Sequence, residues 1–331
     1  MIIKTMENKN IPSIDLGLFN SGSMTSRIET GQLVDNICRH IGFLKIKNHD
    51  VPKTVIGNAW NAAESFFSLP EKEKNKYKPK VASSPRGYFP MQSETLTKSR
   101  GIQTPPDLKE AFSCGSQFSQ QSQQDNLDFF YGKNIWPNEP KNFKDAWQQY
   151  YQAMEKLSLN IMSLFAVALE LESDYFNEFY TNHISALRAL NYPPTKNILL
   201  PDQQRAGAHT DYGSLTILLP DHNVGGLEVK HPNEEWIPIE AEEDTFIINI
   251  GDMMARWTND RWVSTLHRVV TPSNPKQKIT TRRQSIAFFQ NPNFDANINC
   301  LPTCLDRGAR AKYSSIEAGQ YLMDRFHATI K

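Results

Sequence analysis

Apolar residues recur every three or four positions in three stretches of the first half of the chain, a pattern typical of helices with one buried face. The longest stretch covers residues 141–171, and shorter ones cover 31–41 and 52–67. Gly42 follows the first of these and is a suitable residue to end it. We expect the longest helix to brace a sheet, because an aromatic and methionine stripe of this kind usually packs in a core.

The texture changes near residue 186, where short apolar runs alternate with Gly, Pro, Asn and Asp. Many short strands joined by tight turns indicate a sandwich or barrel. The predicted strands of this half cover 214–219, 225–229, 236–239, 245–252, 263–270 and 283–289. Earlier in the chain, 11–16 and 43–46 are also predicted strands, 79–106 is predicted to be irregular, and 116–126 a surface loop. A Ser-x-x-Glu pattern at Ser314 predicts a C-terminal helix.

No internal repeat or linker divides the chain, so residues 1–331 are predicted to form a single compact unit. Within it we distinguish a mixed helical and strand region with the bracing helix (1–180), a core of strands (181–295) and a C-terminal helical segment (296–331). The predicted class is α+β with a mainly β core.

Composition narrows the function. The 331 residues carry 36 basic and 36 acidic side chains, a formal net charge of +0, which gives no support for nucleic-acid or membrane-surface binding. No stretch is long and apolar enough to span a bilayer, and the N-terminus lacks a signal-peptide core. Four cysteines are too few for a disulfide framework. We therefore expect a cytoplasmic protein with reduced thiols, and we expect it to be a monomer.

The candidate chemistry begins with His209 and Asp211, which are two residues apart. In an extended strand such residues point to the same face. His267 lies on a later predicted strand. Two histidines and one carboxylate form a facial triad with open positions, which suits non-haem Fe(II) and O2 chemistry. A lone His-x-Asp is weak evidence, because two polar residues at a loop–strand junction are common.

Arg283 and Ser285 form a second pair on one strand face, with Ala287 and Phe289 following on that face. A guanidinium and a hydroxyl together make a good receptor for a carboxylate. Taken alone, a strand-end arginine more often makes a surface salt bridge. The order of the two pairs with His267 between them favours a metal site beside a carboxylate site.

In this order of motifs the sequence resembles the isopenicillin N synthase-like group of 2-oxoglutarate/Fe(II)-dependent dioxygenases. The resemblance extends over nearly the whole chain. Besides the His and Arg motifs, it is carried by landmarks at 11–16, 42–52, 66–70, 86–88, 107–112 and 191–193.

The resemblance implies a double-stranded β-helix, or jelly roll, with flanking helices and with Fe(II) held by His209, Asp211 and His267. It implies 2-oxoglutarate as cosubstrate and O2 as oxidant. The far carboxylate of 2-oxoglutarate is expected against Arg283 and Ser285, with Tyr192 and Asn191 as further candidate donors. Family habit also suggests three substrate-binding residues, namely Arg86, Tyr88 and Phe289.

The implied activity is oxidation of a C–H bond in a small, carboxylate-bearing metabolite of specialised metabolism. Hydroxylation, desaturation and oxidative ring closure all begin with the same hydrogen abstraction, so the motifs leave these three outcomes open. Two alternatives remain at this point. One is a 2-oxoglutarate-independent oxidase of the isopenicillin N synthase or aminocyclopropane carboxylate oxidase type, and the other is a non-catalytic binding or sensor protein of the same fold.

Overall fold

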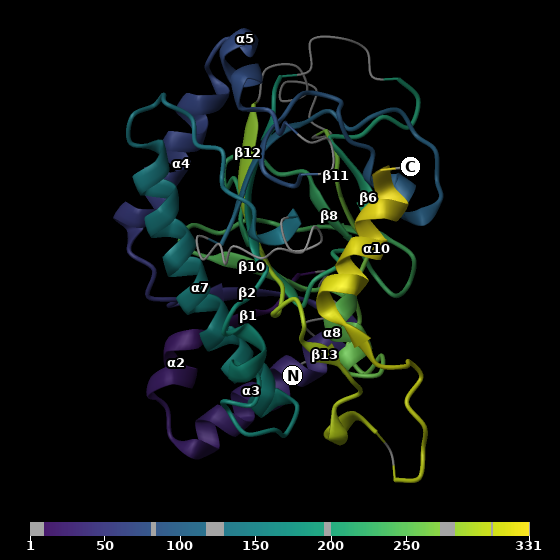
Figure 1. The fold of residues 1–331 in the computed structure, drawn as a ribbon. Helices are drawn as coiled ribbons and strands as arrows, with labels where there is room; N and C mark the ends of the chain where they lie inside the picture. Colours follow the sequence, from purple (N-terminus) through teal and green to yellow (C-terminus); the bar gives the residue numbers. More distant parts are fainter. Residues whose placement is uncertain are drawn as a thin grey trace.

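The computed structural model describes residues 10–80, 84–116, 129–194, 200–271, 282–305 and 307–330. Within these ranges a β core is flanked by helices on one side and crossed by the C-terminal helix on the other (Figure 1). The predicted surface loop at 116–126 lies outside the described residues except for Ser116.

Two sheets form the core of the described residues. The larger has the strand order β1 (Ser13–Asp15), β2 (Phe43–Lys47), β10 (Phe246–Ile250), β7 (Leu215–Leu219), β12 (Arg283–Gln290), β5 (Ala186–Tyr192), β4 (Glu110–Gly115) and β3 (Gly87–Phe89). The smaller has the order β6 (Ala206–His209), β11 (His267–Val269), β8 (Leu227–Lys230) and β9 (Trp236–Pro238). Strands β13 (Asn297–Ile298) and β14 (Ile316–Glu317) pair separately. Residues of both main sheets line one cavity, so the sheets enclose it.

The helices are α2 (Leu16–Ser21), α3 (Met24–His40), α4 (Lys53–Phe67), α5 (Glu71–Lys74), α7 (Phe143–Ala168), α8 (Asp252–Trp257) and α10 (Ala318–Ile330). Short 3-10 helices cover Asn75–Tyr77, Leu96–Arg100, Asn177–Tyr180 and Pro302–Cys304, the second of which is η2.

Helix α7 confirms the predicted bracing helix. Its apolar stripe is buried, and it packs against α3, α4 and β12 (Figure 1). Gly42 ends the preceding helical region as predicted: it has a φ of 63° and donates its N–H to the carbonyl of Ile37 at 3.2 Å. A left-handed residue in this position is favourable for glycine and unfavourable for most others.

Four details of the predicted elements are corrected. The strand predicted over 263–270 is regular only at His267–Val269. The region 79–106 contains β3 and η2 besides irregular chain. The run 11–16 divides into a short strand and the start of α2. The C-terminal helix begins at Ala318 after β14, so the Ser314 pattern does not cap it.

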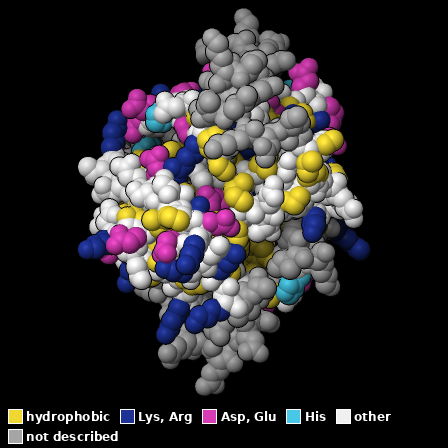
Figure 2. Space-filling model, turned by 90° about the horizontal axis from the view of Figure 1, so that it is seen from above, with side chains coloured by type: hydrophobic (Ala, Val, Ile, Leu, Met, Phe, Trp, Pro, Cys, Tyr) yellow, Lys and Arg dark blue, Asp and Glu magenta, His cyan; other side chains and the backbone are white. Residues whose placement is uncertain are grey.

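The surface agrees with the neutral charge. On the face seen in Figure 2, basic and acidic side chains are interspersed around hydrophobic ones. Among the described residues, no helix has the length and apolar character needed to cross a membrane. All four cysteines are free thiols, as predicted.

Candidate metal and cosubstrate site

Strand pairing brings the two candidate histidine ligands together. His267, the first residue of β11, lies directly opposite His209, the last residue of β6, and the two imidazole rings are 4.3 Å apart between centroids. Side chains that face each other across antiparallel strands approach this closely by construction. The register that makes them neighbours joins segments that are far apart in the sequence.

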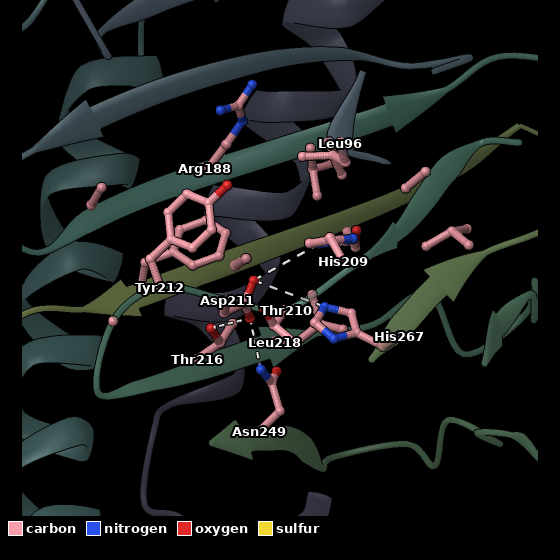
Figure 3. A pocket seen from close by; sticks show the side chains of 18 of the residues that line it. Leu96, Arg188, His209, Thr210, Asp211, Tyr212, Thr216, Leu218, Asn249 and His267 are labelled. Carbon is pink, nitrogen blue, oxygen red and sulfur yellow. Dashed lines mark hydrogen bonds and ion pairs between the residues drawn. The ribbon is translucent and has the colours of Figure 1, made fainter. Parts of the chain in front are cut away.

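Asp211 completes the cluster from outside the strand. Strand β6 ends at His209, so Asp211 lies in the turn leading to β7. The prediction that the two residues share an extended strand is therefore wrong. Helix α8 holds this turn, because the N–H groups of Asp252 and Met253 donate to the carbonyls of Asp211 and Tyr212 at 2.7 and 3.2 Å. Asp211 Oδ1 lies 3.9 Å from His209 Nε2 and 3.8 Å from His267 Nε2 (Figure 3).

The second oxygen of Asp211 is fixed by two buried donors. Thr216 on β7 donates its hydroxyl to Oδ2 at 2.5 Å, and Asn249 on β10 donates its side-chain amide at 2.7 Å (Figure 3). These bonds turn Oδ1 toward the imidazoles. Neither donor was predicted from the sequence, although a polar residue within a strand of otherwise aliphatic, buried residues is a recognisable signal of a polar partner.

Both imidazoles have the tautomer that can bind a metal ion through Nε2. Nδ1 of His209 lies 2.7 Å from the Gly207 carbonyl and Nδ1 of His267 lies 3.1 Å from the Thr265 carbonyl. A carbonyl only accepts hydrogen bonds, so Nδ1 carries the proton and Nε2 keeps its lone pair. Burial, and then the neighbouring His267, lower the pKa of His209 to about 3, which keeps it neutral.

Asp211 is the anionic member of the cluster. Burial opposes its ionisation, but the two histidines and the bonds from Asn249 and Thr216 outweigh burial and lower its pKa. Two neutral nitrogens and one carboxylate oxygen, all within 4.8 Å of one another, fit an octahedral Fe(II) with three positions left open.

Replacing Asn249 with leucine should weaken metal binding by roughly tenfold, the lower end of the effect usual for groups that hydrogen-bond to a ligand. The reason is that Asp211 would lose one of the two donors that orient its Oδ1. A titration with Fe(II) under anaerobic conditions measures the change. Lys45→Met, which removes a buried polar side chain from neighbouring β2 that contacts Glu242, is the matched control. Equal affinities in the wild type and Asn249→Leu would contradict this role.

Arg283 is a buried cation that lines the same cavity. Its side chain is 2% exposed, its guanidinium carbon is 4.9 Å from the centre of the Tyr192 ring, and it donates to Ser285 Oγ at 3.3 Å. Within the part of the chain that the structure describes, Arg283 forms no ion pair with a carboxylate, and its Nε has no hydrogen-bond partner. A buried cation requires an anion, so a carboxylate ligand fits here.

The alternation of side chains along a strand determines which of the remaining predicted residues line the cavity. Arg283, Ser285, Ala287 and Phe289 all line the cavity of about 220 Å³, as their shared face predicts. Tyr192 also lines it. Asn191 does not, because it points to the opposite face of β5, where it donates to Glu110 at 2.7 Å. This position corrects its predicted role as a cosubstrate donor.

Arg86 and Tyr88 also lie away from the cavity, which corrects their prediction as pocket residues. Arg86 is buried and donates to the side chain of Asn134 at 2.6 Å and to the carbonyl of Phe130. Tyr88 donates its hydroxyl to Glu110. Their neighbour Pro85 does line the cavity.

Unpredicted residues line the end of the cavity beyond the metal cluster. Arg188 on β5 donates to Glu94 at 2.6 Å and lies away from the ligand cluster (Figure 3). Aromatic and aliphatic side chains line the same cavity. They include Leu96, Tyr212, Leu322 and Phe326, the last two from α10.

Comparison with known proteins agrees with this site. A family model described as the 2OG-Fe(II) oxygenase superfamily matches residues 181–292, and one described as the non-haem dioxygenase in morphine synthesis N-terminal region matches 11–139. The chain is 33% identical over 330 residues to homoarginine-6-hydroxylase 2-ODD-233 of Oryza sativa subsp. japonica, covering 96% of each. It is 36% identical over 279 residues to the 2-oxoglutarate-dependent dioxygenase caaD of Aspergillus niger, covering 82% of each.

A full-length Neurospora crassa protein, solved in complex with alpha-KG, which is 2-oxoglutarate, has a similar structure. The TM-score is 0.86 at 33% identity, and the match covers 96% of each chain. These relatives favour 2-oxoglutarate dependence over the oxidase and sensor alternatives. The chain therefore belongs to the 2OG-Fe(II) oxygenase superfamily, and it is an Fe(II)- and 2-oxoglutarate-dependent dioxygenase with a jelly-roll core and flanking helices.

Proposed function

We propose that this dioxygenase oxidises a C–H bond of a small, carboxylate-bearing metabolite of specialised metabolism. The observation that carries the proposal is Arg188, a cation that lines the same cavity as the ligand cluster, together with mainly apolar and aromatic residues. Relatives at similar identity include homoarginine-6-hydroxylase and a proline hydroxylase, buaE of Petromyces alliaceus. Their substrates are amino acids, which carry a carboxylate.

In this proposal His209, Asp211 and His267 hold Fe(II), and Arg283 and Ser285 receive the far carboxylate of 2-oxoglutarate. Tyr192 supports the arginine, because its ring face lies against the guanidinium. When bound by these three ligands, Fe(II) would supply the oxidising chemistry, with O2 as oxidant and 2-oxoglutarate as the cosubstrate that is converted to succinate and CO2. The protein binds the two carboxylates at separate places in the cavity.

Arg188 at the substrate end of the cavity is a salt-bridged cation. Arg188 shares Glu94 with Lys109, whose Nζ lies 3.4 Å from the second Glu94 oxygen. The Nε of Arg188 has no hydrogen-bond partner among the described residues. A substrate carboxylate beside Arg188 would gain charge-assisted hydrogen bonds, while Tyr212, Phe289 and Phe326 would contact the rest of the molecule. This arrangement points one end of the substrate away from the metal and leaves its other end near the ligand cluster.

The test has two stages. An anaerobic titration with Fe(II) and then 2-oxoglutarate should give the visible charge-transfer band of the chelate. A set of amino acids and other small carboxylic acids is then screened for stimulated succinate release, with the corresponding carboxamides as controls. The proposed substrate class would be contradicted if neither the acids nor any other small molecule with an anionic group stimulated succinate release.

Arg188→Met should leave the charge-transfer band with 2-oxoglutarate intact but lower substrate-dependent kcat/KM by roughly 30-fold or more. The loss corresponds to a charge-assisted hydrogen bond of about 2 kcal/mol or more. The measurement compares succinate release with and without the substrate found in the screen. Arg188→Lys keeps the charge but not the planar donor pair, so its kcat/KM should lie between those of the wild type and Arg188→Met. An unaltered kcat/KM in Arg188→Met would remove Arg188 from the substrate site.

A further inference from the structure

Asp107 belongs to the landmark at 107–112 and has so far no role in the reaction. Its side chain is only 2% exposed, and it does not line the cavity. Its Oδ1 accepts from the backbone N–H of Gly207 at 3.0 Å, and its Oδ2 accepts from Leu96 N–H at 3.2 Å and Lys109 Nζ at 2.8 Å. A buried carboxylate with three donors is a fixed point in the structure.

One of these bonds leads to the metal cluster. Gly207 donates its N–H to Asp107, and its carbonyl accepts a hydrogen bond from His209 Nδ1 at 2.7 Å. The strand and η2 lie close together here, because a Cβ on Gly207 would lie 2.6 Å from Thr97 Cγ2. Gly207, whose carbonyl orients the His209 imidazole, is therefore held at its N–H by a side chain from the first half of the chain.

A second bond leads to the substrate end of the cavity. Lys109 lies between Asp107 and Glu94, at 2.8 and 3.4 Å, and Glu94 accepts from Arg188 at 2.6 Å. Burial opposes the charge on Lys109, but the two carboxylates raise its pKa, so it remains a cation. Hydrogen bonds and ion pairs, joined through the backbone of Gly207, thus connect Arg188 with the imidazole of His209.

We infer that Asp107 is a positioning residue. Through Gly207 it orients the His209 imidazole, and through Lys109 and Glu94 it connects this orientation with Arg188 at the substrate end. The inference rests on the proposed metal ligands. It gives a physical role to the first acidic residue of a landmark that lies far from every ligand in the sequence.

Asp107→Asn is an informative change because it keeps the size of the side chain. All three partners of Asp107 are donors, so the new amide nitrogen must face a donor in either orientation. An amide nitrogen that faces Gly207 would meet one N–H group. An amide nitrogen on the other side would meet the N–H of Leu96 and the ammonium of Lys109. The amide nitrogen is therefore expected beside Gly207, where it pushes the strand away and turns the imidazole.

The experiment titrates the wild type and variants with Co(II), without 2-oxoglutarate or substrate, and follows the visible d–d absorption. Asp107→Asn should raise the Co(II) dissociation constant by about tenfold and change the shape of the d–d band. The matched control is Glu110→Gln, on the neighbouring β4. Glu110 is equally buried and accepts from Lys74, Tyr88 and Asn191 but does not contact Gly207. It should keep the wild-type Co(II) affinity and band, even if its melting temperature falls.

The outcomes separate the two proposals. If the wild type and His209→Ala bind Co(II) equally well, the proposed metal ligands are wrong. If His209→Ala loses affinity while Asp107→Asn matches the wild type in affinity and spectrum, Asp107 does not position His209. A uniform loss in Asp107→Asn and Glu110→Gln would also overturn the inference, since any buried charge would then have the same effect.

A second pair of variants keeps the test open if Asp107→Asn does not fold. Gly207→Ala places a methyl group against Thr97 and should displace the same peptide, again raising the Co(II) dissociation constant. Thr97→Ser removes the Cγ2 atom that the new methyl meets, after which the nearest atom is Asp107 Oδ1 at 3.3 Å. The double variant should therefore recover most of the affinity. Unchanged affinity in Gly207→Ala would overturn the inference.

Discussion

Replacing Asp211 with alanine should lower turnover by at least about a thousandfold, because metal catalysis contributes several kcal/mol to the reaction. The change removes the anionic ligand between His209 and His267 and leaves the Thr216 and Asn249 donors without an acceptor. His209→Ala should have a similar effect. Succinate release in the presence of 2-oxoglutarate and substrate measures turnover, and an anaerobic Fe(II) titration reports whether the loss follows metal binding.

His183→Gln is the matched control for these ligand variants. His183 is also a partly buried histidine paired with a carboxylate, Glu155, at 2.9 Å, but it does not line the cavity. It should retain turnover within a few-fold of the wild type. Near-normal activity in Asp211→Ala or His209→Ala would show that the cluster is not the catalytic metal site.

The second large effect is expected from Arg283→Leu, which should weaken 2-oxoglutarate binding by roughly a hundredfold. Removing one partner of a buried, hydrogen-bonded charge pair costs about 2–5 kcal/mol, and the cosubstrate carboxylate would be that stranded partner. The Fe(II) affinity measured without 2-oxoglutarate should stay unchanged, since Arg283 does not contact the ligand cluster. Titration of the charge-transfer band with 2-oxoglutarate gives the affinity directly.

Two further variants grade the effect. Arg283→Lys keeps a cation but loses the planar pair of donors, so its affinity should fall between those of the wild type and Arg283→Leu. Ser285→Ala removes a single hydroxyl and should weaken binding by only about tenfold, in line with one hydrogen bond to a charged group. The same affinity for 2-oxoglutarate in all three variants and the wild type would exclude Arg283 from cosubstrate binding.

Much of the fold and the chemistry followed from periodicity and motif order. The alternation along β12 predicted correctly that Arg283, Ser285, Ala287 and Phe289 share a face, because a strand fixes that relation locally. The long α7 followed equally well from its apolar stripe. Asn191 shows the limit of motif order: the residues at 191–193 mark the family, but β5 turns Asn191 away from the cavity that Tyr192 lines.

What the sequence could not supply was register between distant strands. The pairing of His209 with His267 depends on how β6 meets β11, and no local pattern encodes it. The same holds for Thr216 and Asn249, which become partners of Asp211 only because β7 and β10 are neighbours in the larger sheet. Arg188 was missed because no strand was predicted over its segment, and a single arginine in a short apolar run carries no sign of which cavity it faces.

The ligand cluster has a mechanical consequence. Its two histidines stand on the smaller sheet, whereas the donors that orient Asp211 stand on the larger one. An ion bound by all three side chains therefore fastens one sheet to the other. Ligands that bind only the folded state add their binding free energy to its stability. The cavity is consequently most resistant to opening when it is loaded for catalysis, and the empty enzyme is the form most exposed to unfolding and proteolysis.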